Sequence, residues 1–278
     1  MPELPEVETV RRGLAAEVVG RCVERVEVGR DRVVRRTSRE ALIDGLTGTT
    51  FTGADRRGKY LLLPLDSGDG LMIHLRMSGQ VLLAPRGADR PAHTHVVAHL
   101  DDGRELRFVD PRTFGEVVVY DPDRLEVELP GVAALGVDPI ADPFPREQLR
   151  RIVRSTGRAL KPLLLDQHVV AGVGNIYADE ILHRARLRPD RAASSLDAAA
   201  TWRLHRAIGD VLRAAIDAGG STLGDAQYVD TSGAGGSYQD EHRVYGRTGE
   251  RCSTCGRGWI RRTISGGRST HFCPWCQR

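Results

Sequence analysis

Four of the five cysteines form two Cys-x2-Cys pairs near the C-terminus, Cys252 with Cys255 and Cys273 with Cys276, separated by 17 residues. Each pair places two thiolates on one tight turn, and two such turns complete the tetrahedral ligand set that Zn²⁺ prefers. A redox dithiol fits two pairs in one short segment poorly, and disulfides are not expected without a secretory signal. Because four cysteines leave no open coordination position, we expect one structural Zn²⁺ in a C-terminal zinc finger.

The segment that carries these cysteines is strongly basic. From His242 to Arg278 there are eight Arg and one Glu, whereas the whole chain has a net charge of only +3. Clustered positive charge indicates a polyanionic partner. Residues 261–268 are typical of a β-hairpin with a Gly-Gly turn, which would project Arg side chains towards phosphates. The alternatives are an Arg-rich surface that meets only solvent and a zinc ribbon that only holds a fold together.

The remaining chain changes its pattern twice. Residues 3–19 place apolar side chains at helical spacing and carry a proline in the first turn, which predicts an amphipathic helix. From about residue 21 to 120, short alternating runs separated by turn residues predict a β-sandwich or barrel. A stretch rich in proline and glycine follows, and after it helices are expected at 147–153, 160–167, 176–186 and 198–218.

These patterns predict an α+β fold with an N-terminal helix plus β-sandwich, then a helical domain with a C-terminal four-cysteine zinc finger. The expected boundaries are 1–130 for the first domain, 131–146 for a linker, 147–240 for the helical domain and 241–278 for the finger. Residues 221–237 within the helical domain are expected to form a mobile loop. No run approaches the roughly 18 apolar residues of a membrane span, and the first residues lack a secretory core, so the expected location is the cytoplasm.

The N-terminus offers a candidate nucleophile. Removal of Met1 would expose the secondary amine of Pro2 at a helix N-terminus, where the positive end of the helix dipole disfavours the protonated form. Glu3 is adjacent and could act as a general acid or base. The alternative is an ordinary helix start, because many chains begin Met-Pro-Glu.

Lysine is scarce in this chain, which contains 38 Arg but only Lys59 and Lys161. The two lysines are candidates for roles that need a compact ammonium rather than a guanidinium. The alternative is that they survived Arg-for-Lys replacement by chance.

Six motifs, spread in order over the whole chain, resemble those of bacterial formamidopyrimidine-DNA glycosylases. They are MPELPEVETVRRGL at 1–14, RGKYL at 57–61, HLRMSG at 74–79, DPRTFG at 110–115, GVGNIYADE at 172–180 and GRSTHFCP at 267–274. The resemblance implies a base-excision repair enzyme that removes oxidised purines (8-oxoguanine, formamidopyrimidines) through a Schiff base and cleaves the strand as an AP lyase. It also implies a helix-two-turn-helix domain, damaged double-stranded DNA as partner, no nucleotide cofactor, and a monomer at the bacterial nucleoid.

The resemblance also implies residue roles. Pro2 looks like the nucleophile that attacks the sugar C1′, Glu3 like its acid/base partner, and Lys59 like a phosphate contact that assists elimination. Met77, Arg112 and Phe114 resemble the residues that fill the gap left by a flipped nucleotide. Asn175 and Arg268 resemble phosphate ligands beside the lesion, and His93 and Lys161 resemble two further contacts with DNA. Arg268, as a phosphate ligand beside the lesion, is grouped with the catalytic residues.

The sequence departs from the family pattern in three places. Arg76 stands where many relatives carry glycine, Thr113 replaces a common second arginine, and Ser221–Ser237 matches poorly the loop that closes over an extruded base. Two other functions therefore stay open. One is the same fold acting mainly on oxidised pyrimidines, and the other is a non-catalytic zinc-ribbon DNA-binding protein.

Overall fold

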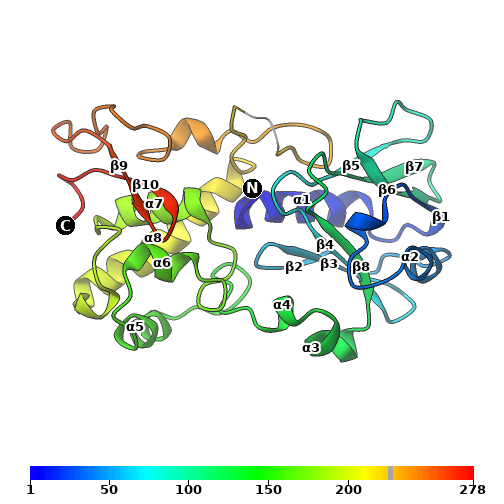
Figure 1. Cartoon of the computed structure of the whole chain (residues 1–278), viewed down its shortest axis with the longest axis horizontal. Helices are drawn as coiled ribbons and strands as arrows, with labels where there is room; N and C mark the ends of the chain where they lie inside the picture. The colour runs from blue at the N-terminus through cyan, green and yellow to red at the C-terminus, as the bar shows by residue number, and fades with distance from the viewer. Residues whose placement is uncertain (225–227) are drawn as a thin grey trace. The chain divides into compact units, whose positions relative to one another are not determined.

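The computed structural model describes residues 1–224 and 228–278, which form two compact units (Figure 1). The first unit comprises Met1–Ala134 and Ala218–Ser237, and the second comprises Leu135–Asp217 and Tyr238–Arg278. The sequence analysis placed 218–237 with the helical domain, whereas its contacts place it in the first unit. Tyr228 is buried in that unit's core, and the Leu83 N–H donates to the Thr231 carbonyl oxygen at 2.8 Å. The predicted mobile loop includes Asp225–Gln227, which lie outside the described residues.

The first unit opens with helix α1 (Leu4–Glu17). Its apolar stripe of Val7, Val10 and Leu14 is fully buried. Proline suits the first turn because that position has no helical hydrogen bond to lose. The predicted N-terminal helix is therefore confirmed to within two residues at its C-terminal end.

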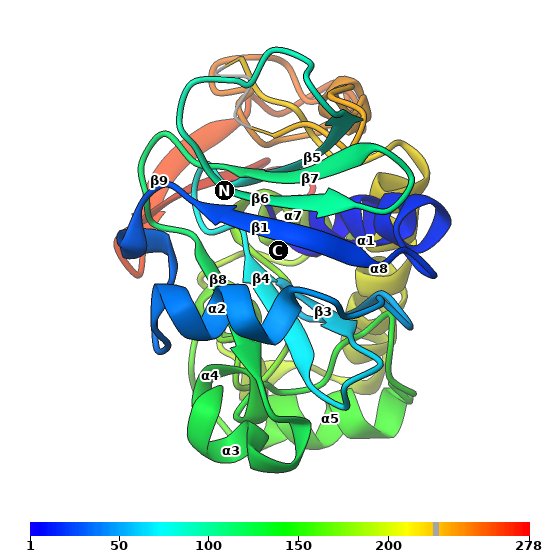
Figure 2. The ribbon, with the colours of Figure 1, turned by 90° about the vertical axis from the view of Figure 1, so that its right-hand side faces the viewer.

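Two four-stranded antiparallel sheets pack face to face in the first unit (Figure 2). One has the order β1-β6-β7-β5, with β1 (Val23–Val28), β5 (Gln80–Pro85), β6 (Thr94–Leu100) and β7 (Arg104–Val109). The other has the order β2-β3-β4-β8, with β2 (Asp55–Arg57), β3 (Tyr60–Pro64), β4 (Gly70–His74) and β8 (Glu116–Tyr120). Side chains from both sheets, such as Ile73 and Phe108, share one apolar core, so the predicted β-sandwich is confirmed.

Shorter elements complete this unit. Helix α2 (Arg39–Leu46), which the sequence analysis missed, packs against β1 and β8. The others are η1 (Asp31–Val33), η2 (Pro122–Arg124), α3 (Leu125–Glu128) and α4 (Pro130–Ala133). Leu129 and Val132, from the α3–α4 region, cover the outer face of the second sheet at Met72.

The second unit is helical and ends in a small two-stranded sheet. Its helices are α5 (Arg146–Arg154), α6 (Leu160–Leu165), α7 (Asn175–Ala185) and α8 (Ala198–Asp217), with short turns η3 (Ala193–Ser195) and η4 (Tyr238–Glu241). Strands β9 (Arg261–Ser265) and β10 (Arg268–Phe272) form the predicted hairpin. Its turn, Gly266-Gly267, has φ of +56° and +74°, values that favour glycine. Among the described residues, no helix has the length and apolar character to cross a membrane.

Candidate functional site

The start of α1 is held from two sides. Pro2 is buried, and Glu3 is only 2% exposed. One carboxylate oxygen of Glu6 accepts the Glu3 backbone N–H at 2.7 Å, and the other accepts the Ser221 N–H at 2.8 Å. The segment 218–237 therefore rests on the first turn of α1, beside the two residues expected to perform the chemistry.

Lys59 lies in the two-residue turn that joins β2 to β3. The buried guanidinium of Arg56 donates to the Gly58 carbonyl oxygen at 2.8 Å and to the Glu8 carboxylate at 3.1 Å. Burial opposes ionisation of Glu8, but hydrogen bonds and charges from Arg11 and Arg56 outweigh it and lower the pKa of Glu8 below its usual value. The ion pair between Glu8 and Arg56 thus fixes the Lys59 turn against α1, whose N-terminus carries Pro2.

His74, at the end of β4, supports the loop that carries Met77. Its Nδ1 accepts the Arg76 backbone N–H at 2.9 Å, and its ring meets Tyr60 edge-on with centroids 4.3 Å apart. Burial, helped by the positive charges of Arg76 and Lys59, lowers the pKa of His74 to about 3. The ring is therefore neutral at physiological pH, as its acceptor role requires.

The Met77 loop is a tight turn with a strained residue. The Gly79 N–H donates to the Leu75 carbonyl oxygen at 2.9 Å, and a Cβ on Gly79 would lie 2.6 Å from that oxygen. Arg76 has φ of +53°, and its guanidinium pairs with Glu116 at 2.6 Å. Arg76 therefore occupies the left-handed conformation that a glycine adopts without strain, and its ion pair offsets part of that strain.

Asp110 is a positioning residue that the sequence analysis did not single out. Its fully buried carboxylate accepts the Ser78 hydroxyl at 2.6 Å and the N–H groups of Gly115 at 2.7 Å and Arg112 at 3.2 Å. Its own N–H donates to the His93 carbonyl oxygen at 3.0 Å. Asp110 thus joins the three loops predicted to contact DNA, two through its carboxylate and the third through its backbone N–H. The sequence signal for it was its place as the first residue of the DPRTFG motif, at the end of a strand.

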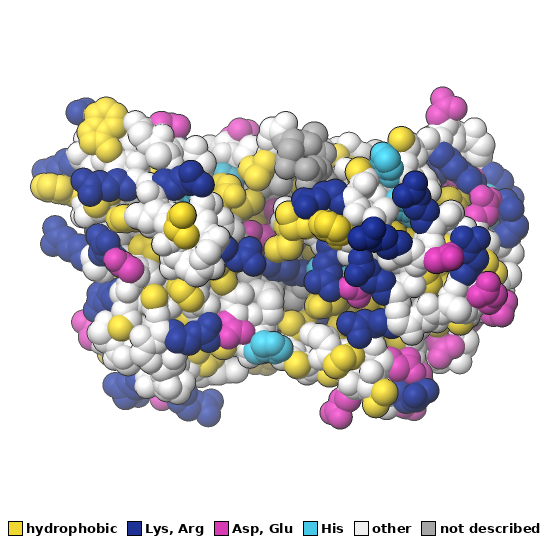
Figure 3. Space-filling model, viewed as in Figure 1, with side chains coloured by type: hydrophobic (Ala, Val, Ile, Leu, Met, Phe, Trp, Pro, Cys, Tyr) yellow, Lys and Arg dark blue, Asp and Glu magenta, His cyan; other side chains and the backbone are white. Residues whose placement is uncertain are grey.

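The predicted contacts on these loops are accessible to different degrees. His93 and Arg112 are exposed, Phe114 is 38% exposed, and Met77 is half-buried. The Arg112 guanidinium lies 4.8 Å from the centre of the Phe114 ring, a cation–π distance. His93 and Thr113 have φ of +66° and +54°, and such strain is concentrated at functional loops. Basic side chains gather on the face of this unit seen in Figure 3.

Asn175 and Arg268, the predicted phosphate ligands, lie in the second unit. Asn175 is the first residue of α7, its Nδ2 donates to the Ser269 hydroxyl at 3.4 Å, and its buried Oδ1 has no hydrogen-bond partner among the residues that the structure describes. Arg268 is exposed and precedes Ser269 at the start of β10. A helix N-terminus and an exposed guanidinium therefore lie in the same unit, linked through the neighbouring Ser269, an arrangement suited to a phosphate.

Lys161 does not fit the predicted contact with DNA. Its side chain is 0% exposed, its Nζ pairs with Asp179 at 2.7 Å, and it donates to the Ser269 carbonyl oxygen at 2.7 Å. Asp179 also accepts the His271 N–H at 2.8 Å. Lys161 therefore holds β10 against α7 and positions the neighbours of Asn175 and Arg268 instead of meeting DNA itself.

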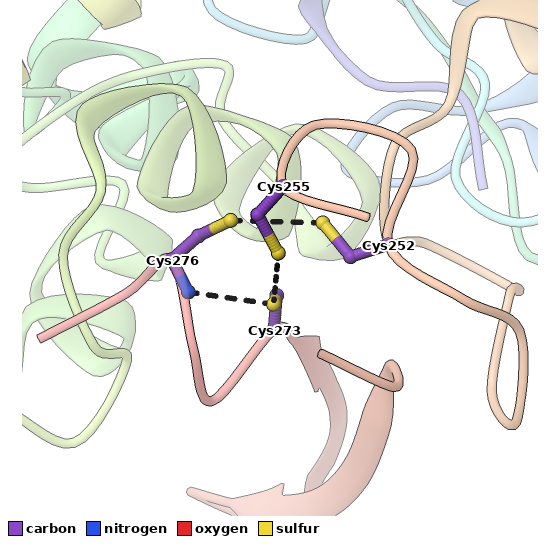
Figure 4. A group of neighbouring side chains, drawn as sticks. All are labelled: Cys252, Cys255, Cys273 and Cys276. Carbon is purple, nitrogen blue, oxygen red and sulfur yellow. Dashed lines mark hydrogen bonds between the residues drawn. The ribbon is translucent and has the colours of Figure 1, made fainter. Parts of the chain in front are cut away.

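The four paired cysteines converge in the second unit (Figure 4). Their sulfur atoms all lie within 4.8 Å of one another, with Cys252 3.6 Å from Cys276 and Cys255 3.8 Å from Cys273. A tetrahedral Zn²⁺ with bonds of about 2.3 Å requires sulfur atoms about 3.8 Å apart. The predicted ligand set therefore has the geometry of a metal site.

Acid is expected to destabilise this protein through His74. Below pH of about 6.5 the unfolded imidazole binds a proton that the folded one, with a pKa of about 3, does not, so stability is full above pH 6.5 and is lost as pH falls. His74→Asn keeps an acceptor for the Arg76 N–H but does not titrate. The unfolding free energy of each protein is measured with denaturant from pH 7.5 to 4.5. As the pH falls, that of His74→Asn should decrease less steeply than that of the native protein, by up to about 1.4 kcal/mol per pH unit. Equal slopes in the two proteins would contradict this assignment.

Comparisons with known proteins cover the whole chain. The family model for the formamidopyrimidine-DNA glycosylase N-terminal domain matches residues 1–117, and that for the formamidopyrimidine-DNA glycosylase H2TH domain matches residues 135–227. The formamidopyrimidine-DNA glycosylases of Heliobacterium modesticaldum and of a Roseiflexus species are 46% and 45% identical, each covering 100% of both chains.

Solved structures agree with these sequence relatives. The complex of Lactococcus lactis Fpg with Fapy-dG-containing DNA has a TM-score of 0.89 at 38% identity, covering 99% of this chain and 100% of that one. The complex of the same enzyme with DNA that contains an abasic site has a TM-score of 0.89 at 38% identity, covering 99% of both chains. The chain therefore belongs to the formamidopyrimidine-DNA glycosylase family.

Proposed function

We propose that this protein is a bifunctional DNA glycosylase and AP lyase that removes oxidised purines, such as 8-oxoguanine and formamidopyrimidines, from double-stranded DNA. The observation that carries the proposal is the Glu8–Arg56–Gly58 contact, which ties the Lys59 turn to the helix that begins beside Pro2 and Glu3. The full-length similarity to formamidopyrimidine-DNA glycosylases supports the same assignment. We expect the protein to act as a monomer on nucleoid DNA in the bacterial cytoplasm.

The chemistry would begin at the nitrogen of Pro2 after Met1 is removed. Its lone pair forms a bond to C1′ as the bond from C1′ to the base breaks, and the base leaves with the bonding electrons and gains a proton. Protonation of the ring oxygen opens the sugar and gives an iminium ion, which acidifies C2′; loss of the C2′ proton then expels the 3′ phosphate. Glu3 would supply and accept protons, and Lys59 would contact the phosphate that departs and assist its elimination by exchanging a proton beside the sugar.

Access to C1′ requires the damaged nucleotide to leave the stack. Met77 and Phe114 would fill the vacated space, and Arg112 would offer its donors to the orphaned partner base. Their loops share the buried Asp110 carboxylate, so their relative positions are set before DNA arrives. Asn175, Arg268 and His93 would hold the backbone phosphates on either side.

One Zn²⁺ would be held by Cys252, Cys255, Cys273 and Cys276, whose spacing fits it. With all four positions filled by thiolates, the ion would supply folding energy rather than reactivity. Cys273 follows directly after β10, so the metal would fix the hairpin that presents Arg268.

A panel of otherwise identical duplexes tests this function. Duplexes with 8-oxoguanine or a formamidopyrimidine should be cut at least about tenfold faster than those with an oxidised pyrimidine, because a site built for purine edges leaves polar groups unpaired with the smaller base. Single-turnover cleavage on denaturing gels gives the rates. Faster cutting of the oxidised pyrimidine would favour the same fold with pyrimidine specificity, and binding without cutting of any duplex would favour a non-catalytic zinc-ribbon protein.

A further inference from the structure

Helix α7 carries three buried polar side chains that contact the zinc-finger segment. The Asp179 carboxylate accepts the His271 N–H at 2.8 Å. The Glu180 carboxylate accepts three consecutive backbone N–H groups, from Arg243 to Tyr245, at 2.8 to 2.9 Å. These contacts hold β10 and residues 243–245 of the finger against α7, the helix that begins with Asn175.

The third of these side chains, His183, faces the cysteines. Its Nε2 lies 3.7 Å from the Cys252 sulfur, and the two residues are only 4% and 1% exposed. His183 is not a ligand in the described geometry, because the group of mutually close metal-binding atoms contains only the four cysteine sulfurs. The contact fits an N–H donor on a thiolate, because a metal-bound thiolate can only accept a hydrogen bond.

The charge of the finger gives this contact an energetic role. Four thiolates around one Zn²⁺ carry a net charge of −2, and hydrogen bonds to sulfur stabilise that charge where water is excluded. Backbone N–H groups do so elsewhere in the site, from Gly258 to Cys255 at 3.4 Å and from Cys276 to Cys273 at 3.4 Å. At Cys252 the neighbouring polar group is the His183 ring, a side chain of a helix outside the finger.

We propose that His183 donates a hydrogen bond from Nε2 to the Cys252 thiolate and thereby makes retention of the finger's metal depend on α7. The proposal rests on the structural Zn²⁺ proposed above. Removal of the donor takes away one hydrogen bond that stabilises the negative charge of the sulfur cluster, so the ion dissociates faster. Groups around a ligand shell typically change metal affinity by about 10- to 100-fold.

The test is zinc release from the full-length, zinc-loaded protein into an excess of a chromophoric chelator. His183→Phe fills the same space without a donor and should release zinc about tenfold faster than the native protein. His183→Gln retains an N–H donor and should release zinc at nearly the native rate. His242→Phe is the matched control, because His242 is also buried but its ring meets Tyr238 and Tyr245 edge-on instead of a cysteine; it should also remain near native.

Equal zinc release rates in the native and His183→Phe proteins would overturn the proposal. It would also be overturned if His242→Phe released zinc as fast as His183→Phe, because the loss would then follow from any disturbance of the packing around the finger. If His183→Phe does not fold, zinc release from His183→Gln about tenfold faster than from the native protein would also overturn it. A purified native protein without zinc would overturn both this proposal and the proposed metal. Release rates are independent of catalysis, so a failure at His183 alone leaves the glycosylase proposal intact.

Discussion

Blocking the nitrogen of Pro2 is expected to abolish covalent capture of lesion-containing DNA by borohydride. Borohydride reduces an iminium to a stable amine, so a native protein with Met1 removed should give a protein–DNA adduct on denaturing gels. One extra residue before Pro2 converts its amine into an amide, whose lone pair is delocalised and does not attack C1′. The adduct should fall by at least about a thousandfold, as expected for loss of a nucleophile.

A matched variant separates chemistry from folding. Pro2→Gly leaves a free amine at the same position and should retain measurable capture. The added residue could disturb the first turn of α1, which the Glu6 contacts to Glu3 and Ser221 hold in place. Both proteins should therefore also be tested for binding to a duplex with a stable abasic analogue, which needs no nucleophile. Mass spectrometry of the mature N-terminus establishes whether Met1 is absent. Undiminished capture by the blocked protein would exclude Pro2 as the nucleophile.

Features encoded over a few neighbouring residues could be predicted from sequence. The helical spacing of Val7, Val10 and Leu14 located α1, and Gly266-Gly267 located the finger hairpin. The two cysteine pairs predicted a four-sulfur cluster because each pair sets its own turn. The β-sandwich followed from alternation in most strands, but β2 has only three residues and was too short to produce a pattern.

Features that depend on distant partners could not be predicted. Lys161 was taken for a DNA contact because it resembled a lysine that lies near DNA in the family, yet Asp179 neutralises it inside the unit. The role of Asp110 depends on Ser78, more than 30 residues earlier in the chain, which no local pattern links to it. Residues 221–237 were expected to form a mobile loop because of their composition, although Tyr228 anchors this segment in the sandwich core. The sequence indicated the residue types of the site, and tertiary contacts decided which of them face solvent.

Lys59→Arg is expected to lower the rate of cutting of lesion duplexes by roughly a hundredfold, the lower end of general acid–base contributions. Lys59 is only 7% exposed and forms a two-residue turn with Gly58. Gly58 has φ of +57°, so the backbone of this turn has little freedom to adjust to a larger side chain. An ammonium is compact and can exchange a proton near the reacting sugar, whereas a guanidinium is bulkier and stays protonated at any working pH. Single-turnover cleavage measures the chemical step, and a gel shift on undamaged duplex measures binding.

The substitution is informative because it keeps the positive charge. A purely electrostatic contact to phosphate should survive it with a modest loss, and the charge that helps to keep His74 neutral is also retained. Binding to undamaged duplex should therefore change little while cutting falls. Arg57→Lys, one residue before the same turn, is the matched control for disturbance of the hairpin and should cut lesion duplex at close to the native rate. If Lys59→Arg also cuts at the native rate, Lys59 is an ordinary phosphate contact. Its presence in a chain with 38 arginines is then a matter of chance.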